Sequence, residues 1–364
     1  MKSKVVIVTE YFYPRDKPDS RLLTDISRAI AEASNGDFEV VCNSGLHGVE
    51  LSVVVFRKLN KGDKLFAVTN PAFLLVIFAV FKKLKKFHYT LLVYDIFPEN
   101  LPPAGLIKES SLLYKWVKKI FDWSYSKANL LVVIGRDMQQ LVTAKTGGKV
   151  PTVLIPNWCD TDAIIPSAKA DNPIIQQYDL EHKTVFAFTG NFGRVQGIDN
   201  LLKAASLVSH KDFVLLFIGE GAMRPAIEKH IAEHPKGNII YAGSFPSTEQ
   251  NIFLNACDIA IVSLNEGMYG LGVPSKSYYN MAAGKPILYV GHQKSEIAQL
   301  IHEHSIGWSC PPNDINALSA MMWYICEHKE ELLPYGANAR LLAQNNFSKK
   351  IVLQKYFDLY KDFQ

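Results

Sequence analysis

Short apolar, β-branched runs alternate with longer amphipathic stretches along most of the chain. Continuous apolar runs are typical of strands buried on both faces, whereas the longer stretches have the spacing of helices. This alternation predicts parallel sheets joined by right-handed helical crossovers, and therefore an α/β fold.

The pattern places the expected elements at definite positions. In the first half, strands are expected at residues 5–9, 38–42, 53–56, 90–94, 130–134 and 152–155, with helices that include 21–33 and 112–125. In the second half, strands are expected at 185–189, 214–218, 239–242, 259–262 and 287–290, with helices near 197–207, 222–233, 247–256, 275–283 and 294–302. The tail from residue 314 to 364 has a largely helical pattern.

The chain is too long for one ordinary core. Its 364 residues fit two domains. The alternation of strand and helix patterns is interrupted at residues 160–173, where proline, serine and alanine are frequent. We therefore expect an N-terminal domain at 1–165 and a C-terminal domain at 166–345. A last helix at 346–364 is expected to return to the first domain.

Composition excludes several classes of protein. Hydrophobic residues make up 48% and charged residues 20%, which is globular, and a net charge of +4 is too small to indicate a nucleic-acid partner. The five cysteines are dispersed without metal-ligand spacing, which favours reduced thiols in a cytoplasmic protein. The longest apolar run has ten residues, whereas a membrane-spanning helix needs about twenty. The first strand begins near the N-terminus without a signal-peptide pattern, so we expect a cytoplasmic location.

A glycine-rich turn follows the strand expected at 185–189. It reads Gly190-Asn-Phe-Gly193-Arg-Val-Gln-Gly197 and leads into a helix. Glycines permit positive φ and close backbone approach, and free N–H groups at a helix start attract anions. The spacing differs from the dinucleotide fingerprint, so no nicotinamide or flavin cofactor is indicated. We expect a phosphate contact here, with a purely structural turn as the alternative.

A second glycine-rich turn follows the strand expected at 259–262. It reads Glu266-Gly-Met-Tyr-Gly-Leu-Gly-Val-Pro-Ser-Lys276. Both turns lie at the carboxyl ends of parallel strands, where open α/β sheets bind ligands. A diphosphate fits them because backbone amides supply fixed dipoles while Arg194 and Lys276 supply positive charge. A lysine in the first turn of a helix opposes the helix dipole, so a nearby anion explains Lys276 better than simple solvation does.

The run Val273-Pro-Ser-Lys-Ser-Tyr-Tyr-Asn-Met-Ala-Ala-Gly-Lys-Pro286 resembles the donor-site helix of family 4 glycosyltransferases, which have the GT-B fold. It is most similar to the subgroup that builds bacterial surface polysaccharides, including N-acetylfucosamine-type transferases. Further matches follow in family order: Tyr11-Phe-Tyr-Pro14, Asp95-Ile-Phe-Pro-Glu99, Ile155-Pro-Asn-Trp-Cys-Asp160, Gly219-Glu-Gly221, Gly243-Ser-Phe-Pro246 and Asn255-Ala-Cys-Asp-Ile-Ala260.

The resemblance implies two facing Rossmann-like domains, the first for the acceptor and the second for the donor. It also implies a hexosyltransferase-like enzyme that retains the anomeric configuration and uses neither a metal nor another cofactor. A nucleotide-diphosphate sugar, expected to be UDP-linked, would donate to a saccharide or lipid-linked acceptor in surface polysaccharide or glycoconjugate biosynthesis. The residues expected to bind the donor are Gly190, Asn191, Phe192, Gly193, Glu220, Phe245, Tyr269, Gly270, Leu271, Gly272, Val273, Pro274, Ser275 and Tyr279.

The chain departs from the family pattern at several positions. Leu271 and Tyr279 stand where the family usually carries two glutamates, the second of which holds the nucleotide ribose. Asn191 and Gln196 stand where an arginine and a lysine often flank the first glycine turn. The run Pro14-Arg-Asp-Lys-Pro-Asp-Ser-Arg21 replaces the usual N-terminal Gly-Gly loop.

The reaction requires stabilisation of the departing diphosphate. Without a metal, we expect Arg194, Lys276 and the amides of the two turns to supply it, and we expect the pair Asp160-Thr-Asp162 to be solvated. Asp95 and Glu99 follow the strand expected at 90–94 and are candidates to orient or deprotonate the acceptor hydroxyl. The alternatives are that Asp95 caps a turn and that Glu220 caps a helix instead of approaching the nucleotide.

Two stretches of the first domain combine apolar and basic residues. Residues 72–81 run directly into Lys82-Lys83-Leu84-Lys85-Lys86, and the helix at 112–125 carries Leu112, Leu113, Trp116, Val117, Ile120 and Phe121 beside Lys115, Lys118 and Lys119. Such stretches favour peripheral contact with an anionic inner membrane face. Equally, the apolar residues could cover the sheet.

Two other functions remain open. A sugar-nucleotide 2-epimerase also uses two Rossmann-like domains, but the sequence shows no cluster of acid/base carboxylates with a histidine. A non-catalytic relative that binds a nucleotide sugar would explain the absent glutamates.

Overall fold

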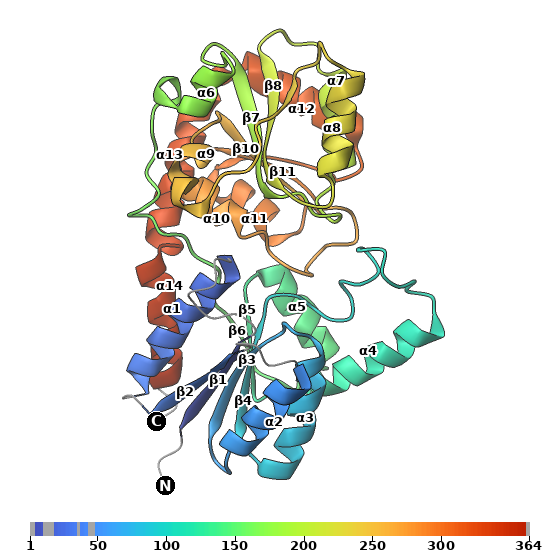
Figure 1. The fold of residues 1–364 in the computed structure, drawn as a ribbon, viewed down its shortest axis with the longest axis vertical. Helices are drawn as coiled ribbons and strands as arrows, with labels where there is room; N and C mark the ends of the chain where they lie inside the picture. Colours follow the sequence, from blue (N-terminus) through green and yellow to red (C-terminus); the bar gives the residue numbers. More distant parts are fainter. Residues whose placement is uncertain (1–3, 10–17, 35–36, 43–47, 362–364) are drawn as a thin grey trace. The chain divides into compact units, whose positions relative to one another are not determined.

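The computed structural model describes residues 4–9, 18–34, 37–42 and 48–361. The chain divides into two compact units: unit 1 is Met1–Pro156, Gly270–Val273 and Lys350–Gln364, and unit 2 is Asn157–Tyr269 and Pro274–Lys349. Each unit contains a six-stranded parallel sheet with helices against it (Figure 1). The predicted α/β class is therefore confirmed.

Unit 1 has the strand order β2-β1-β3-β4-β5-β6, and every neighbouring pair is parallel. Its strands are β1 (Val5–Thr9), β2 (Phe38–Cys42), β3 (Lys64–Val68), β4 (His88–Val93), β5 (Leu130–Val133) and β6 (Thr152–Leu154). Its helices are α1 (Pro18–Ala33), α2 (Gly48–Lys58), α3 (Phe73–Lys85), α4 (Leu112–Tyr125), α5 (Arg136–Lys145) and α14 (Lys349–Lys361). Tyr356 and Tyr360 of α14 pack edge-on against Phe66 of β3, with ring centroids 6.4 and 6.0 Å away.

The strand predicted at 53–56 is wrong, because these residues belong to α2. Leu51, Val55 and Leu59 are fully buried and lie four residues apart, which is one face of a helix. A strand would have placed Val53 and Val55 on the same face, yet Val53 is 44% exposed. The helical spacing of the buried positions therefore overrides the β-branched composition.

Unit 2 has the strand order β12-β11-β10-β7-β8-β9, again all parallel. Its strands are β7 (Thr184–Asn191), β8 (Phe213–Glu220), β9 (Ile239–Tyr241), β10 (Ile259–Ser263), β11 (Ile287–Val290) and β12 (Gly307–Cys310). Its α-helices are α6 (Pro173–Gln177), α7 (Ile198–Leu207), α8 (Arg224–Glu233), α9 (Gln250–Leu254), α10 (Lys276–Ala282), α11 (Glu296–His304), α12 (Ile315–Glu327) and α13 (Leu332–Asn346). Strand order reverses between β7 and β10, so their carboxyl ends form a topological switch point.

The structure groups residues 157–165 with unit 2, although the sequence placed the boundary after residue 165. The Cys159 amide donates to the Phe347 carbonyl, and the Lys349 amide donates to the Cys159 carbonyl, both at 3.0 Å. The Arg340 guanidinium donates to the carbonyls of Thr161 and Ile164, each at 2.8 Å. These bonds attach the segment to α13 and the residues that follow it.

Two sequence features need a structural note. The family match at residues 11–14 and the first half of the run 14–21 lie outside the described residues. None of the described helices has both the length and the apolar character needed to cross a bilayer.

Candidate active site

The first glycine-rich turn contacts the end of β10 and the residue Asn265 at the switch point of unit 2. The Asn265 amide donates to the Val195 carbonyl at 2.8 Å, and Asn265 Nδ2 donates to the Arg194 carbonyl at 3.0 Å. Gly197 has φ +64°, and a methyl group added there would lie 3.0 Å from Ser263 Oγ, so the first turn touches the end of β10 where a side chain would fit poorly. The turn after β7 therefore contacts the end of β10 and the start of the segment that follows it.

Lys276 extends from the start of α10 to the end of β7. Its Nζ lies 3.6 Å from the centre of the Phe188 ring, and a methyl group added at Gly190 would lie 4.0 Å from the same nitrogen. The residue as a whole is half-buried, but Nζ itself is enclosed and has no hydrogen-bond partner among the described residues. Burial lowers the pKa of the Lys276 ammonium from 10.5 to about 7.

A buried ammonium without a partner is costly unless an anion neutralises it. The Phe188 ring favours the charged form, but a cation–π contact contributes only about 2 kcal/mol even when desolvated. Two further buried polar atoms, Gln196 Oε1 in the first turn and Ser263 Oγ at the end of β10, also have no hydrogen-bond partner among the described residues. The first turn and the end of β10 therefore present polar groups that the described part of the chain does not satisfy.

The first turn offers backbone donors and a free cation. In the described part of the chain, the amides of Gly193, Arg194 and Val195 have no hydrogen-bond acceptor. Arg194 is exposed and forms no ion pair with any described residue, and Gly190 (φ +97°) and Asn191 are exposed as well. These donors and the Lys276 ammonium suit an anionic ligand.

The remaining predicted donor residues occupy different surroundings. Phe245 and Tyr279 are half-buried, as are Pro274 and Ser275, which precede α10. The Tyr269 ring packs on the His292 ring at 4.3 Å. Gly270, Leu271, Gly272 and Val273 group with unit 1, where the Ile96 amide donates to the Leu271 carbonyl at 3.3 Å. Leu271 and Val273 are buried there.

Asp95 follows β4 in unit 1 and is half-buried. Its amide donates to Thr69 Oγ1 at 3.3 Å, and its carboxylate accepts a hydrogen bond from Asn70 Nδ2 at 3.2 Å. The carboxylate is thus oriented by an amide side chain.

Comparison with known proteins shows which family the chain belongs to. A family model described as "Glycosyl transferases group 1" matches residues 171–342. The probable glycosyltransferase WbjE of Pseudomonas aeruginosa is 43% identical over 305 residues, which are 84% of this chain and 76% of that protein. The chain belongs to the group 1 glycosyltransferases. The putative colanic acid biosynthesis glycosyl transferase WcaI of Escherichia coli is 24% identical over 62% of this chain and 55% of that protein.

Solved structures agree with the fold of this glycosyltransferase. Anabaena HepE in complex with UDP superposes with a TM-score of 0.76 at 15% identity, covering 99% of this chain and 100% of that chain. Sucrose-phosphate synthase from Thermosynechococcus elongatus gives 0.75 at 15% identity, covering 100% of this chain and 99% of that chain. The predicted GT-B fold is thereby confirmed.

Two predicted donor residues of the glycosyltransferase have other roles. Phe192 is fully buried against Phe188 and Phe217, and its amide donates to the Glu220 carbonyl at 2.7 Å. Its side chain is part of the core, so the prediction that it contacts the donor is wrong for this structure. The reason is that a turn residue after a buried strand can point inward as readily as outward.

Glu220 is exposed at the end of β8 but is already paired. Its carboxylate accepts hydrogen bonds from Arg224 at 2.8 Å and from the Tyr241 hydroxyl at 3.0 Å, and the Arg224 contact lowers the pKa of the Glu220 carboxyl. It does not cap α8, whose N-cap is Met223 without a side-chain hydrogen bond. The capping alternative is therefore excluded, and a nucleotide would have to compete with Arg224.

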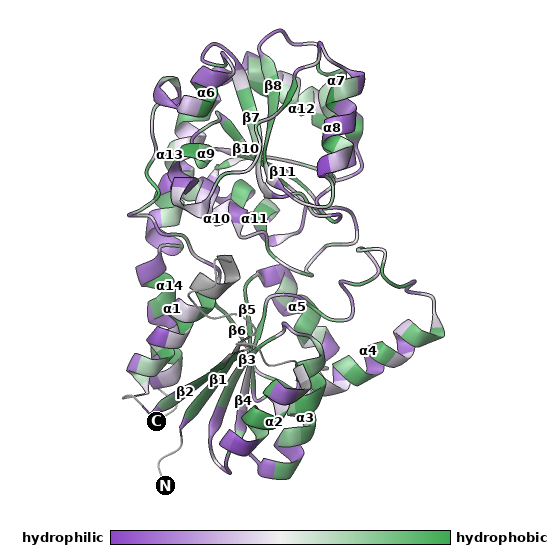
Figure 2. Ribbon diagram, in the orientation of Figure 1, coloured by the Kyte–Doolittle hydropathy of each residue, from purple (hydrophilic) through white to green (hydrophobic). Residues whose placement is uncertain are grey.

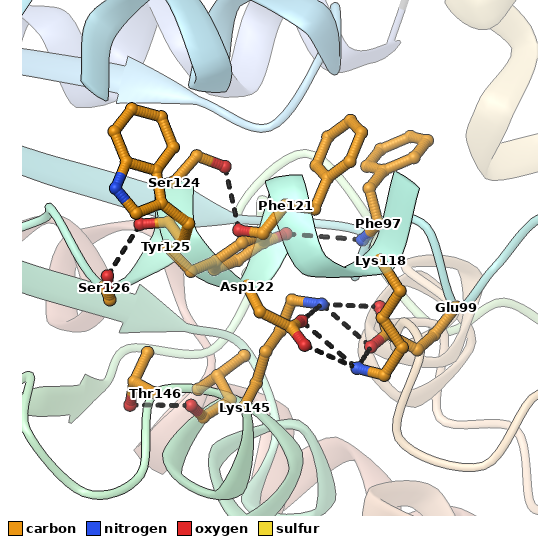
Figure 3. A network of polar contacts seen from close by, with 12 residues as sticks. Phe97, Glu99, Lys118, Phe121, Asp122, Ser124, Tyr125, Ser126, Lys145 and Thr146 are labelled. Atoms are coloured by element: carbon orange, nitrogen blue, oxygen red, sulfur yellow. Dashed lines mark hydrogen bonds and ion pairs between the residues drawn. The ribbon is translucent and has the colours of Figure 1, made fainter. Parts of the chain in front are cut away.

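Glu99 is held in a charge network instead of facing open solvent (Figure 3). Its carboxylate lies 2.6 Å from Lys118 Nζ and 2.8 Å from Lys145 Nζ, and Asp122 lies 2.5 Å from the same Lys145 Nζ. Burial lowers the pKa of Lys145, whose side chain is only 2% exposed, and the two carboxylates oppose that effect. The Glu99 carboxylate is thus engaged by two ammonium groups that belong to the fold.

The pair at 160–162 is occupied by local bonds. Asp160 Oδ1 accepts from the amides of Asp162 and Ala163 at 3.2 and 3.0 Å, which is a turn cap. In the residues that the structure describes, no group of three or more histidine, cysteine or acidic side chains is placed to hold a metal.

Proposed function

We propose that this glycosyltransferase transfers a hexose-like sugar from a UDP-sugar to a saccharide or lipid-linked acceptor in surface polysaccharide assembly. We further propose that the reaction retains the anomeric configuration and stabilises the leaving UDP with protein groups instead of a metal. The observation that carries the proposal is the enclosed Nζ of Lys276 at the switch point of unit 2, which lies over the Phe188 ring and has no hydrogen-bond partner among the described residues.

A diphosphate would satisfy this site. Its oxygens would accept from Lys276 Nζ and from the amides after Gly193, and Arg194 would add a second positive charge from the exposed side of the turn. Preorganised donors aimed at a developing anion are each worth about 3–4 kcal/mol, or about 10²–10³ in rate. These groups need no reorganisation when the glycosidic bond to UDP breaks.

The names of the relatives support the substrate class. WcaI is described as a colanic acid biosynthesis enzyme, and HepE was crystallised with UDP. We propose a polysaccharide acceptor because WcaI is named for colanic acid biosynthesis. We propose a uridine nucleotide because HepE was crystallised with UDP.

A thermal-shift panel tests the donor. UDP-, GDP- and dTDP-sugars are added to the wild type, to Lys276→Met and to the control Lys203→Met, which changes an exposed lysine on α7. A UDP-sugar at about a hundred times its Kd should stabilise the wild type and the control by about 2.7 kcal/mol and leave Lys276→Met unchanged. Equal responses to all three nucleotides would contradict the proposal, and so would a UDP-sugar that stabilises Lys276→Met as much as the wild type.

Nucleotide release tests catalysis. UDP should appear only when donor and a saccharide acceptor are both present, and the product should keep the α or β configuration of the donor, as read by NMR of the anomeric proton. Binding without acceptor-dependent release would identify a non-catalytic binder, and release with inversion would refute the retaining step.

A further inference from the structure

The N-terminal half of α4 exposes large apolar side chains. Leu112, Leu113 and Trp116 are 83%, 62% and 65% exposed, and they define what we call the α4 patch. Trp116 is four residues after Leu112 and three after Leu113, so the three side chains share one face of the helix. Leu106, in the loop before the helix, is 67% exposed as well. Single exposed apolar side chains are common on proteins, whereas a contiguous group of them is typical of an interaction site.

The patch is held on a well-anchored helix. Ser111 caps the start of α4 by accepting from the Tyr114 amide at 3.1 Å, and Tyr114 and Tyr125 are buried. Near the other end, the network of Glu99, Lys118, Asp122 and Lys145 attaches the helix to α5 and to the loop after β4 (Figure 3). The helix runs outward from the sheet of unit 1 (Figure 1). Its exposed end is therefore positioned by contacts elsewhere along the helix.

The surroundings of the patch are basic. Lys108, Lys115 and Lys119 are exposed, and none of them forms an ion pair with a described residue. Glu109 is the exposed acidic residue of the same segment, and Asp122 is already engaged by Lys118 and Lys145. Figure 2 shows hydrophobic and hydrophilic residues side by side along α4. Unpaired lysines next to exposed leucine and tryptophan are typical of surfaces that bind anionic membranes.

We propose that the α4 patch docks this protein on an anionic phospholipid bilayer, with Leu112, Leu113 and Trp116 in the interface and Lys108, Lys115 and Lys119 on lipid phosphates. A protein partner fits less well, because interface cores are depleted in lysine. The proposal goes beyond the transfer reaction and does not depend on the identity of the donor.

The second stretch that the sequence suggested for a membrane is only partly exposed. In α3, Leu74, Leu75 and Phe78 are buried, whereas Val80 and Leu84 are 44% and 67% exposed. Lys82 donates to the Lys127 carbonyl and Lys85 to the Leu59 carbonyl, both at 2.6 Å. The buried apolar residues cover the sheet, as the alternative interpretation expected, and these two lysines serve the fold.

Vesicle flotation tests the proposal. The full chain is mixed with vesicles of phosphatidylcholine alone or of phosphatidylcholine with phosphatidylglycerol, and the floated fraction is measured against lipid concentration. The wild type should float with the anionic vesicles, and added salt should weaken the binding. Each lysine near an anionic surface contributes about 1 kcal/mol, so Lys115→Gln with Lys119→Gln should weaken binding by about 25-fold.

Apolar variants test the insertion. Leu113→Ser with Trp116→Ser should weaken binding to anionic vesicles at least about tenfold, because burying one such side chain is worth 1.5 kcal/mol or more. Leu333→Ser on α13, where the side chain is 82% exposed, and Lys236→Gln are matched controls that should bind like the wild type. All these side chains are exposed, so thermal unfolding should be the same in every variant.

Three outcomes would overturn the proposal. The first is a wild type that does not float with anionic vesicles, and the second is α4 variants that float like the wild type. The third is a concentration-dependent dimer, measured by light scattering, that dissociates in Leu113→Ser with Trp116→Ser while vesicle binding is unchanged. That result would assign the patch to a second copy of the chain.

Discussion

Replacing Lys276 by methionine should stabilise the ligand-free protein and at the same time remove its response to UDP. Methionine is similarly long and flexible, and it can lie on the Phe188 ring without a charge. In the wild type, the enclosed Lys276 Nζ has no hydrogen-bond partner among the described residues, and burial lowers its pKa to about 7. A group that destabilises the empty protein but binds the ligand is expected at a functional site.

The magnitude follows from the pKa. The difference between 10.5 and about 7 corresponds to about 5 kcal/mol of preference for the neutral form. Below about pH 7, where this cost is fully present, its removal should appear as a rise in Tm of about 10–20 °C for a domain of this size.

The effect has a defined pH dependence. The folded-state pKa of Lys276 is lower than the unfolded one, so the unfolded chain binds a proton that the folded protein releases. The penalty is therefore complete below about pH 7, declines as the pH rises, and vanishes above pH 10.5. The stability difference between Lys276→Met and the wild type should follow the same course.

Chemical and thermal unfolding of the wild type, Lys276→Met and the exposed control Lys203→Met over this pH range would measure the effect. The same series is repeated with UDP. The reasoning is refuted if Lys276→Met is less stable than the wild type at pH 7, because Lys276 would then stabilise the fold. It also fails if UDP still stabilises the variant.

Two further predictions concern proton uptake and the acceptor side. UDP binding should raise the pKa of Lys276, so affinity measured by calorimetry should fall by up to about tenfold per pH unit above pH 7 in the wild type. A pH-independent affinity in the wild type would contradict this. Asp95→Asn should lower kcat about a hundredfold without changing Tm, whereas Glu99→Gln should cost about 2 kcal/mol of stability and leave kcat within a few-fold. The reverse pattern, a large loss of kcat in Glu99→Gln at unchanged Tm, would return the acceptor role to Glu99.

Much of the fold could be predicted from apolar runs. The strands β7, β8, β10 and β11 of unit 2 are fully or largely buried, so their sequences carry a continuous apolar signal. Two strands were not predicted, β3 and β12. In β12, Gly307-Trp-Ser-Cys310 alternates buried and half-buried positions, which is too short a pattern to separate from a loop. Helix α2 was mistaken for a strand because its surface position Val53 is β-branched.

The chemistry of the site could be predicted only where the backbone dictates it. Glycines with positive φ, such as Gly190 and Gly197, mark turns whatever surrounds them. The direction of a side chain depends on tertiary packing, which the sequence motif does not specify. Phe192 therefore lies in the core, and Glu99 is paired with Lys118 and Lys145, although both residues belong to motifs that suggested a site. Lys276 was predicted from the helix dipole, but α10 has only seven residues, and the stronger reason is the enclosure of Nζ above Phe188.

Because the chain departs from the family pattern at the first turn, more of the positive charge for the nucleotide has to come from Lys276. The sequence has Asn191 and Gln196 where the family pattern often has an arginine and a lysine, and Gln196 Oε1 is buried without a hydrogen-bond partner among the residues that the structure describes. Lys276 reaches the same turn from the start of α10, and its Nζ would lie 4.0 Å from a methyl group placed on Gly190. The buried Lys276 ammonium over the Phe188 ring is less hydrated than a cation on the exposed turn would be. Its protonation near neutral pH therefore depends on whether an anionic ligand is bound. Nucleotide binding by this chain should therefore be more sensitive to pH near neutrality than binding by relatives that carry an arginine and a lysine at the positions of Asn191 and Gln196.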